Sequence, residues 1–177
     1  MYSSKLKKVK LLILDVDGVL TDGKIILSNN GDELKSFNVK DGLGIKLLQK
    51  LGVEVAIITG KTSNLVQRRF ESLGVKYIYQ GQSNKIKAYQ SLLARLNFID
   101  NQVAYIGDDL PDLPLLTLVG FSITVNDGHY LIKNKVDFCT SQNGGDGAVR
   151  EVCDMIYKVH GLEKKLVEDF ISLGEAT

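Results

Sequence analysis

The stretch from residue 11 to residue 18 most constrains the fold. Four consecutive aliphatic residues, 11–14, are followed by Asp15, Asp17 and Gly18. The apolar run predicts a strand buried on both faces, as in a parallel sheet. Side chains that follow such a strand lie at the carboxyl edge of the sheet, where open α/β folds bind their ligands. An isolated Asp-x-Asp-Gly also suits a solvated turn, so the rest of the chain must distinguish the two.

Further apolar runs alternate with helical patterns along the chain. The predicted strands cover residues 53–58, 75–79, 103–106, 121–125 and 136–139. The predicted helices cover residues 41–51, 63–73, 83–96, 112–118 and 148–160. Asp41 and Ser83 are the expected N-caps of the first and third of these helices. Such alternation predicts an α/β fold of three layers, α/β/α, with a central, mostly parallel sheet.

Three segments lie outside this alternation. Two short β-type runs joined by an Asn-Gly turn predict a small β-hairpin insertion at residues 24–37, which should pack on another surface, such as that of another subunit. Residues 144–147 form a loop expected to be mobile. Residues 162–177 form a further amphipathic helix or a tail. Because no insertion is large enough for a cap domain, residues 1–177 are expected to form one domain.

Bulk composition excludes several classes of function. The chain has 177 residues, enough for one domain with a full core, and its net charge of +1 offers no broad basic surface for nucleic acid. No apolar run approaches the roughly 20 residues of a membrane span, and the N-terminal run does not read as a signal peptide. Two cysteines, Cys139 and Cys153, are too few for a disulfide framework and favour the cytoplasm.

Polar residues gather where the predicted strands end. They are Asp15, Asp17, Thr59, Asp108 and Asp109, with Lys85 and Asp112 on adjoining helices. In a parallel sheet these ends meet at one edge. Two carboxylates about 4 Å apart repel by roughly 4 kcal/mol at an effective dielectric constant of 20, so either some are protonated or a cation is bound. Oxygen ligands without His or Cys favour a hard cation, and space for water and phosphate favours Mg²⁺ over Ca²⁺.

Four segments resemble, in chain order, the four motifs of the haloacid dehalogenase-like (HAD) phosphatases. They are residues 15–23, residues 57–60, Lys85 and residues 107–112. Residues 37–44, 79–85 and 147–153 are similar to the 3-deoxy-D-manno-octulosonate 8-phosphate phosphatases, and the likeness covers residues 8–160. It implies a Rossmann-like HAD fold without a large cap domain. It also implies a Mg²⁺-dependent phosphatase of lipopolysaccharide precursor synthesis.

The resemblance implies a catalytic role for each motif residue. Asp15 would attack phosphorus and form an aspartyl-phosphate, and Asp17 would act as general acid and then general base. Thr59 and Lys85 would bind the phosphoryl oxygens. Asp15, Asp108 and the backbone carbonyl of Asp17 would hold Mg²⁺. The remaining motif carboxylates, Asp109 and Asp112, would hold metal-bound waters or orient Lys85.

The resemblance also implies a set of substrate contacts. These positions are Asp17, Asn38, Val39, Lys40, Asp41, Gly42, Lys46, Thr59, Gly60, Lys61, Arg69 and Lys85. Lys40 and Lys61 stand where arginine is expected, and lysine offers a point charge in place of a bidentate fork. The exact sugar acid is therefore open, and a nonulosonate 9-phosphate is the alternative substrate.

Two further expectations concern assembly and a different class of function. In the family the hairpin joins those of neighbouring subunits, which implies a homotetramer here. A non-catalytic oligomerisation or sugar-binding module that keeps the fold is the alternative to an enzyme. The complete set of motif residues argues against that module, because a silent module has no need of them.

Overall fold

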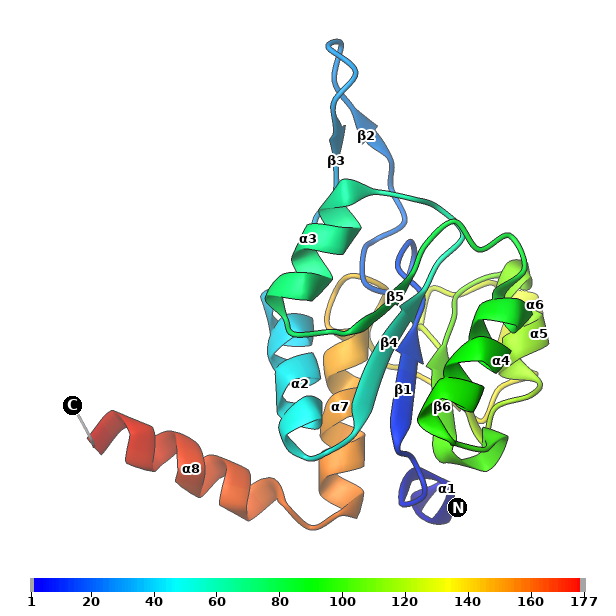
Figure 1. Ribbon diagram of the computed structural model, residues 1–177. Coiled ribbons are helices and arrows are strands. Elements are labelled where there is room, and N and C mark those ends of the chain that lie inside the picture. Colours follow the sequence, from blue (N-terminus) through cyan, green and yellow to red (C-terminus); the bar gives the residue numbers. More distant parts are fainter. Residues whose placement is uncertain (1, 176–177) are drawn as a thin grey trace.

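A six-stranded, fully parallel sheet forms the centre of the computed structural model, which describes residues 2–175 (Figure 1). The strand order is β5-β4-β1-β6-β7-β8. The strands are β1 (Leu11–Leu14), β4 (Glu54–Ile58), β5 (Tyr77–Tyr79), β6 (Val103–Ile106), β7 (Phe121–Thr124) and β8 (Phe138–Cys139). The predicted α/β class is confirmed, and β1 lies inside the sheet between β4 and β6.

Helices cover both faces of the sheet and complete the three layers. One face packs against α1 (Ser3–Leu6), α2 (Val39–Lys50), α3 (Asn64–Ser72) and α7 (Ala148–Val159). The other packs against α4 (Lys85–Leu96), α5 (Leu113–Leu116) and α6 (Tyr130–Lys133). Short 3₁₀ helices are η1 (Asp100–Gln102) and η2 (Leu110–Asp112). Strand β1 serves both cores, because Leu12 and Leu14 point to the first face and Leu11 and Ile13 to the second.

Two predicted helix N-caps are wrong. Helix α2 is capped by Asn38, whose side chain accepts a hydrogen bond from the Lys40 amide at 2.9 Å, and α4 is capped by Asn84 instead of Ser83. The predicted cap Asp41 lies inside α2, where its Oδ1 accepts from the Arg150 amide in the first turn of α7 at 2.7 Å. Several residues near a helix start can cap it, and here tertiary contacts select between them.

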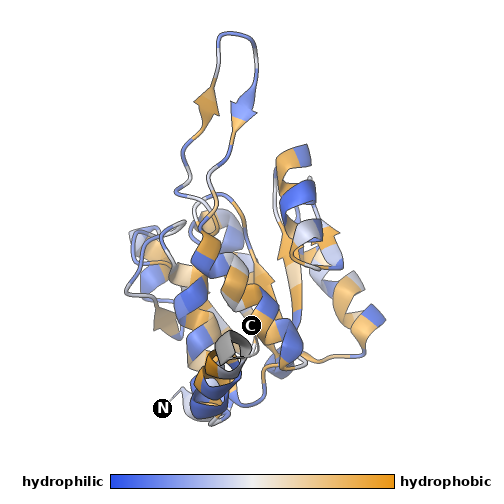
Figure 2. Cartoon of the chain, turned by 90° about the vertical axis from the view of Figure 1, so that its left-hand side faces the viewer, coloured by the Kyte–Doolittle hydropathy of each residue, from blue (hydrophilic) through white to orange (hydrophobic). Residues whose placement is uncertain are grey.

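The hairpin insertion is confirmed, although its paired part is short. Strands β2 (Ile26–Leu27) and β3 (Glu33–Leu34) form a separate antiparallel pair that stands away from the sheet (Figure 2). Its aliphatic side chains are exposed: Ile25 by 58%, Leu27 by 70% and Leu34 by 57%. The expected packing partner of the hairpin is not found within residues 2–175, and the same residues contain no cap domain.

The loop at residues 144–147, expected to be mobile, packs tightly against the loop that follows β1. A Cβ on Gly144 would lie 1.8 Å from the Gly18 carbonyl oxygen, and the Gly145 amide donates to the Val19 carbonyl at 2.9 Å. Glycine is needed here because the two backbones approach so closely. The loop therefore supports the segment that carries Asp17.

The C-terminal segment forms helix α8 (Glu163–Glu175), which extends away from the sheet (Figure 1). Leu162 and Leu166 pack against the core, whereas Val167 and Phe170 are exposed. Residues 1, 176 and 177 lie outside the described part, so the assignment of residues 1–177 to one domain stays a prediction. Among the described helices, none combines the length and the apolar character that a bilayer crossing requires.

Candidate active site

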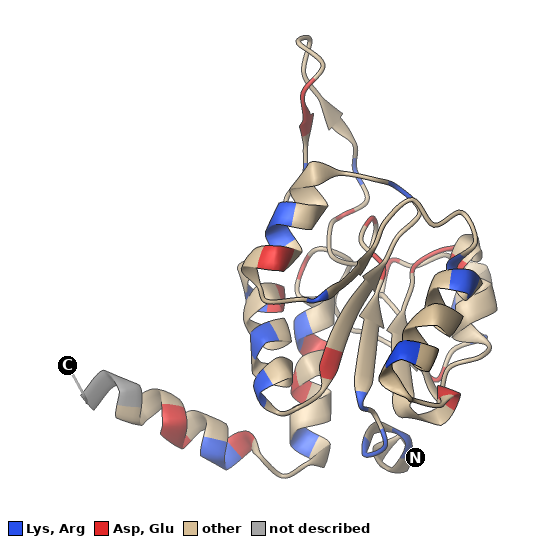
Figure 3. Cartoon of the chain, viewed as in Figure 1, with Lys and Arg blue, Asp and Glu red and all other residues tan. Residues whose placement is uncertain are grey.

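Three carboxylates from distant parts of the chain meet at the carboxyl edge of the sheet. One oxygen each from Asp15, Asp108 and Asp112 lies within 4.8 Å of the others. The sheet causes this convergence, since β1 and β6 are parallel neighbours with Leu14 opposite Ile106. Asp15 continues the pairing by donating its amide to the Ile106 carbonyl at 3.1 Å. Figure 3 shows acidic segments in the loops at this end of the molecule. The predicted convergence is confirmed for these three carboxylates.

Gly18 allows the loop after β1 to approach Asp108. Its φ is +86°, a conformation that favours glycine, and an added Cβ would lie 2.1 Å from a carboxylate oxygen of Asp108. A side chain at this position would therefore displace that carboxylate. The glycine of the Asp-x-Asp-Gly stretch is required both by the turn and by the acidic cluster.

Lys85 bridges two of the carboxylates. Its Nζ lies 2.7 Å from Asp15 Oδ2 and 2.6 Å from Asp112 Oδ1, and it donates to the Tyr105 hydroxyl at 3.1 Å. Asp112 Oδ2 accepts from the backbone amides of Asp108 and Asp109, at 2.9 and 3.1 Å. Both oxygens of Asp112 are thus engaged by protein donors, an arrangement that orients Lys85.

Tyr105 belongs to this network and was missed in the sequence. Its hydroxyl donates to Asp112 Oδ1 at 2.5 Å from a fully buried position on β6. Burial raises the pKa of Tyr105 well above its usual range, so it remains a donor. The only signal in the sequence is a tyrosine within the otherwise aliphatic run 103–106.

The pKa values of the cluster indicate an excess of negative charge. Burial raises the pKa of Asp15 to about 6, against the lowering effect of Lys85. Burial, followed by the charges of Asp112 and Asp15, raises the pKa of Asp108 to about 7. Burial alone would lower the pKa of Lys85, but Asp15 and Asp112 raise it above its ordinary value. The lysine therefore stays charged, and one ammonium does not neutralise three carboxylates.

Asp17 lies beside the cluster and contacts two lysines. Lys35 Nζ is 2.5 Å from its Oδ1, and Lys61 Nζ is 3.9 Å from its Oδ2. Burial alone would lower the pKa of Lys35, but the carboxylates of Asp17 and Glu33 outweigh this effect. The pKa is therefore raised overall, and the side chain stays an ammonium. Lys35 was also missed in the sequence, because it falls inside a predicted strand of the hairpin and no spacing rule connects it to Asp17.

Thr59 follows β4, as predicted, and is buried at 3% exposure. Its amide donates to the Tyr79 carbonyl at 3.0 Å, and its carbonyl accepts from the Gln82 amide at 3.0 Å. Gly60 and Lys61, the next two residues, are exposed. The segment 59–61 therefore leaves the sheet toward solvent at the same edge as Asp15.

The predicted substrate positions on and beside α2 and α3 differ in their surroundings. The Arg69 guanidinium lies 6.0 Å from the Phe37 ring, and a Cβ on Gly42 would lie 2.5 Å from its Nη2, so these residues adjoin. Asn38, which is partly exposed, joins the loop at residue 145 through a 3.4 Å hydrogen bond to that carbonyl. The exposed positions are Val39, Lys40 and Lys46.

Asp41 differs from the other predicted substrate positions. It is 1% exposed, its Oδ2 has no hydrogen-bond partner, and burial raises its pKa to about 6. The side chain offers almost no surface to a ligand, so a contact with the sugar acid stays a prediction. Asp109 is exposed and caps η2 by accepting from the Leu110 amide at 2.7 Å.

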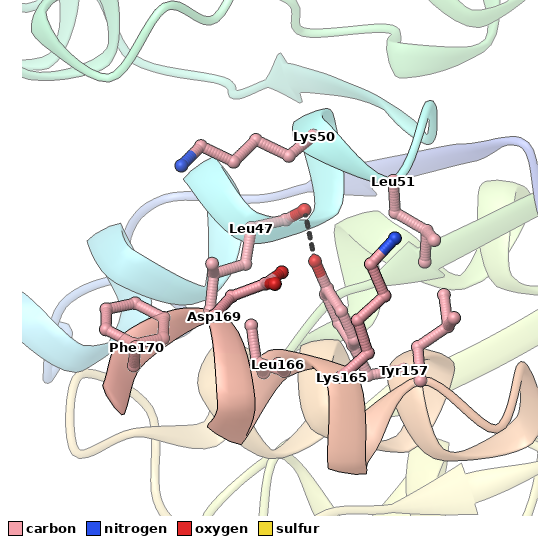
Figure 4. Close-up of a pocket in the computed structure, with 9 residues that line it drawn as sticks. Leu47, Lys50, Leu51, Tyr157, Lys165, Leu166, Asp169 and Phe170 are labelled. Carbon is pink, nitrogen blue, oxygen red and sulfur yellow. Dashed lines mark hydrogen bonds between the residues drawn. The ribbon is translucent and has the colours of Figure 1, made fainter. Parts of the chain in front are cut away.

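A separate hollow lies between the last turn of α2, helix α7 and helix α8 (Figure 4). Aliphatic side chains such as Leu47 and Leu166 line it, and the Tyr157 hydroxyl donates to the Leu47 carbonyl at 2.8 Å. It contains one carboxylate, Asp169, and no arrangement of nucleophile and base. The acidic cluster is the better candidate for catalysis.

Comparisons with known proteins agree with this geometry. The profile of the family described as haloacid dehalogenase-like hydrolase matches residues 77–152. The 3-deoxy-D-manno-octulosonate 8-phosphate phosphatase KdsC of Escherichia coli is 50% identical over 158 residues, which are 89% of this chain and 84% of that protein. The phosphatase of the same name from Yersinia pestis is 52% identical over 148 residues, covering 84% of this chain and 79% of the relative.

A solved structure matches nearly the whole chain. It is the 3-deoxy-D-manno-octulosonate 8-phosphate phosphatase of Moraxella catarrhalis in complex with a magnesium ion, a phosphate ion and KDO. Its TM-score is 0.92 at 43% identity, covering 95% of this chain and 97% of that chain. Identity at this level over most of both chains shows the family. This chain belongs to the 3-deoxy-D-manno-octulosonate 8-phosphate phosphatase family of haloacid dehalogenase-like hydrolases.

Proposed function

We propose that this chain is a Mg²⁺-dependent phosphatase that hydrolyses 3-deoxy-D-manno-octulosonate 8-phosphate to 3-deoxy-D-manno-octulosonate and phosphate, in lipopolysaccharide precursor synthesis. One observation carries the proposal: the Asp15 carboxylate is held 2.7 Å from Lys85 within a cluster that includes Asp108. Identity of 50% to a phosphatase of this name supports the choice of substrate.

The residues present fit a magnesium ion. Asp15 and Asp108 supply hard oxygen ligands, and no His or Cys lies in the cluster. Burial is the main cause of their raised pKa values, about 6 and about 7, and a bound cation would favour the charged form of both carboxylates. Asp112 accepts hydrogen bonds from protein donors on both oxygens. The third proposed ligand is the backbone carbonyl of Asp17, as the family resemblance implies. When bound, Mg²⁺ would neutralise the charge of the phosphoryl oxygens.

In the first half of the reaction, Asp15 attacks phosphorus. A bond forms between its carboxylate oxygen and phosphorus while the bond to the sugar oxygen breaks, which gives an aspartyl-phosphate. The Val16 amide at 2.7 Å from Oδ1 and Lys85 at 2.7 Å from Oδ2 fix the carboxylate. Asp17 gives a proton to the leaving sugar oxygen. Thr59 donates a hydrogen bond to the phosphoryl oxygens, and the Lys85 ammonium offsets their negative charge.

In the second half, a water molecule attacks phosphorus from the side opposite Asp15. Asp17, which has lost its proton, accepts one from that water, and the bond between phosphorus and Asp15 breaks. Phosphate leaves and both aspartates return to their starting states. The resemblance implies that Asp109, whose carboxylate is exposed, would hold a metal-bound water.

The sugar acid is proposed to lie on the cationic rim of the site. The residues concerned are Asn38, Val39, Lys40, Gly42, Lys46, Gly60, Lys61 and Arg69, with Asp41 behind them. Lys61 lies 3.9 Å from Asp17, so its ammonium is beside the proposed acid–base group. Since lysines at 40 and 61 bind carboxylates as point charges, a nonulosonate 9-phosphate is the alternative substrate.

We also propose a cytoplasmic homotetramer. Exposed aliphatic side chains on the hairpin, such as Ile26 and Leu27, support contacts with other copies of the chain. Neither Cys139 nor Cys153 forms a disulfide, which fits a reducing compartment. The net charge of +1 gives no reason to expect nucleic acid as a partner.

Phosphate release tests the proposal. Wild-type protein should release phosphate from the sugar-acid phosphate with Mg²⁺ and lose this activity with a chelator. Asp15→Asn should lower kcat by at least about 10³-fold, because the amide cannot form the acyl phosphate. Equal activity of the variant would refute the nucleophile. No release from any sugar phosphate would favour a non-catalytic module.

A panel of sugar-acid phosphates separates the two substrates. The eight-carbon 8-phosphate should give the highest kcat/KM, and a nonulosonate 9-phosphate should be disfavoured. A higher kcat/KM for the nine-carbon acid would transfer the proposal to the alternative substrate while leaving the chemistry intact.

A further inference from the structure

Lys35 is the one residue of the hairpin whose ammonium lies against a proposed catalytic side chain within residues 2–175. Its Nζ is 2.5 Å from Asp17 Oδ1 and 3.4 Å from a carboxylate oxygen of Glu33. Its side chain is 4% exposed, although the hairpin strands beside it are exposed. By contrast, the side chain of Lys61 is 55% exposed and lies 3.9 Å from the other oxygen of Asp17.

The contact fixes an otherwise free torsion. The χ2 angle of an aspartate is broad and roughly two-fold, so its two oxygens exchange easily unless one is held. A charge-assisted hydrogen bond from a buried ammonium holds Oδ1 of Asp17. Oδ2 is then the oxygen that is left to exchange a proton.

We propose that Lys35 is a positioning residue for the acid–base chemistry of Asp17. Oδ1 accepts from the Lys35 ammonium whether or not Oδ2 carries a proton. Oδ2 can therefore give its proton to the leaving sugar oxygen and later take one from water, while Lys35 keeps all its protons. The inference rests on the proposed function, in which Asp17 is the acid–base group.

Glu33 argues against a role for Lys35 in phosphate binding. Its carboxylate shares the ammonium with Asp17, so the three groups together carry no net positive charge, even when Asp17 holds the proton that it gives to the leaving group. Such a group would not attract a phosphate dianion. Lys85, whose Nζ is 2.7 Å from Asp15 Oδ2, and the proposed cation would serve that purpose.

The test uses two substrates that differ in their need for a general acid. The leaving oxygen of a sugar phosphate is an alkoxide that must be protonated, whereas p-nitrophenyl phosphate releases a stable phenolate. In both cases kcat/KM reports the steps up to departure of this group. The variant is Lys35→Met, and the control is Lys24→Met, which removes a lysine of the same hairpin whose side chain is 76% exposed.

Lys35→Met should lower kcat/KM for the sugar-acid phosphate by about 10- to 100-fold, a part of what a general acid supplies. The loss should lie mainly in kcat. The kcat/KM for p-nitrophenyl phosphate should fall less than about threefold, and Lys24→Met should match wild type with both substrates. Equal losses of kcat/KM with both substrates, or no loss with either, would overturn the proposal. Circular dichroism checks that the variant is folded.

A double-mutant cycle completes the test. If Lys35 acts through Asp17, then Asp17→Asn with Lys35→Met should be no slower than Asp17→Asn alone. Additive losses would contradict the inference. If Asp17→Asn is as active as wild type, the acid–base assignment of Asp17 is refuted. If the wild-type protein is inactive on the sugar-acid phosphate, the proposed substrate is refuted. In that case another alkyl phosphate replaces the sugar-acid phosphate in the comparison with p-nitrophenyl phosphate.

Discussion

Strand β1 and the β2–β3 hairpin are both rich in aliphatic residues, yet their surroundings are opposite. All four residues of β1 have 0% exposure, whereas Ile26 is 50% and Leu27 is 70% exposed. Strand β1 pairs with strands on both sides and has helices on both faces. The hairpin has two residue pairs and no cover within the described chain.

This difference distinguishes aliphatic side chains that stabilise the fold of one chain from those that suit contacts between chains. A hairpin of two strands is at best marginally stable alone, so its aliphatic side chains contribute little to folding of one chain. They suit contacts with other copies, as in the proposed homotetramer. The two regions meet at Asp17, which follows β1 and contacts Lys35 at the base of the hairpin.

The largest effect is expected from a change in β1. Ile13→Ala should lower the free energy of unfolding by about 3 kcal/mol, since it removes buried methyl groups and leaves a cavity in the core between the sheet and α4. Urea unfolding followed by circular dichroism measures the change. A loss below about 1 kcal/mol would mean that the core around β1 can collapse to fill the space.

Asp41, a buried carboxyl group on α2, gives the next prediction. The pKa of Asp41 is raised from 3.8 to about 6, chiefly by burial. Because the folded-state pKa is the higher one, its contribution to stability is full below pH 3.8 and is lost as the pH rises through 6. The loss amounts to about 3 kcal/mol at 1.36 kcal/mol per pKa unit.

Between pH 4 and pH 7, the free energy of unfolding should therefore fall less for Asp41→Asn than for wild type. The side-chain oxygen of the asparagine can still accept a hydrogen bond from the Arg150 backbone amide. Unfolding in urea at several pH values, with Mg²⁺ present, isolates this residue by the difference between the two proteins. Parallel curves for wild type and variant would show that the carboxylate is solvated in solution.

The smallest effect on folding is expected in the hairpin. Leu27→Ser should change the free energy of unfolding of one chain by no more than about 0.5 kcal/mol, because the side chain is exposed. It should, however, dissociate the proposed tetramer. Light scattering after size-exclusion chromatography measures the assembly, and Val167→Ser, at an exposed apolar position on α8, is the control.

Two outcomes would contradict this prediction. A wild-type protein that elutes as a monomer removes the proposed tetramer. A tetramer that survives Leu27→Ser but not Val167→Ser would move the interface from the hairpin to α8 and reverse the interpretation of the hairpin.

The sequence by itself determined the sheet and the place of the reaction. Continuous apolar runs mark buried parallel strands, and the parallel topology brings the residues after them to one edge. Asp15 and Asp108 could therefore be assigned to one cluster from their positions at strand ends, whereas the role of Thr59 stays a prediction. Their types and spacing, together with the resemblance to a family, also indicated a cation and a phosphoryl transfer.

Only the tertiary structure decided the contacts between elements that are distant in sequence. It brought Tyr105 to Lys85, brought Lys35 to Asp17, and buried Asp41 against α7. Repeat patterns specify which face of an element is apolar, but they do not specify which polar side chain reaches across to another element. Such contacts depend on loop paths and close approaches, like that of Gly18 to Asp108, which arise when the whole chain packs.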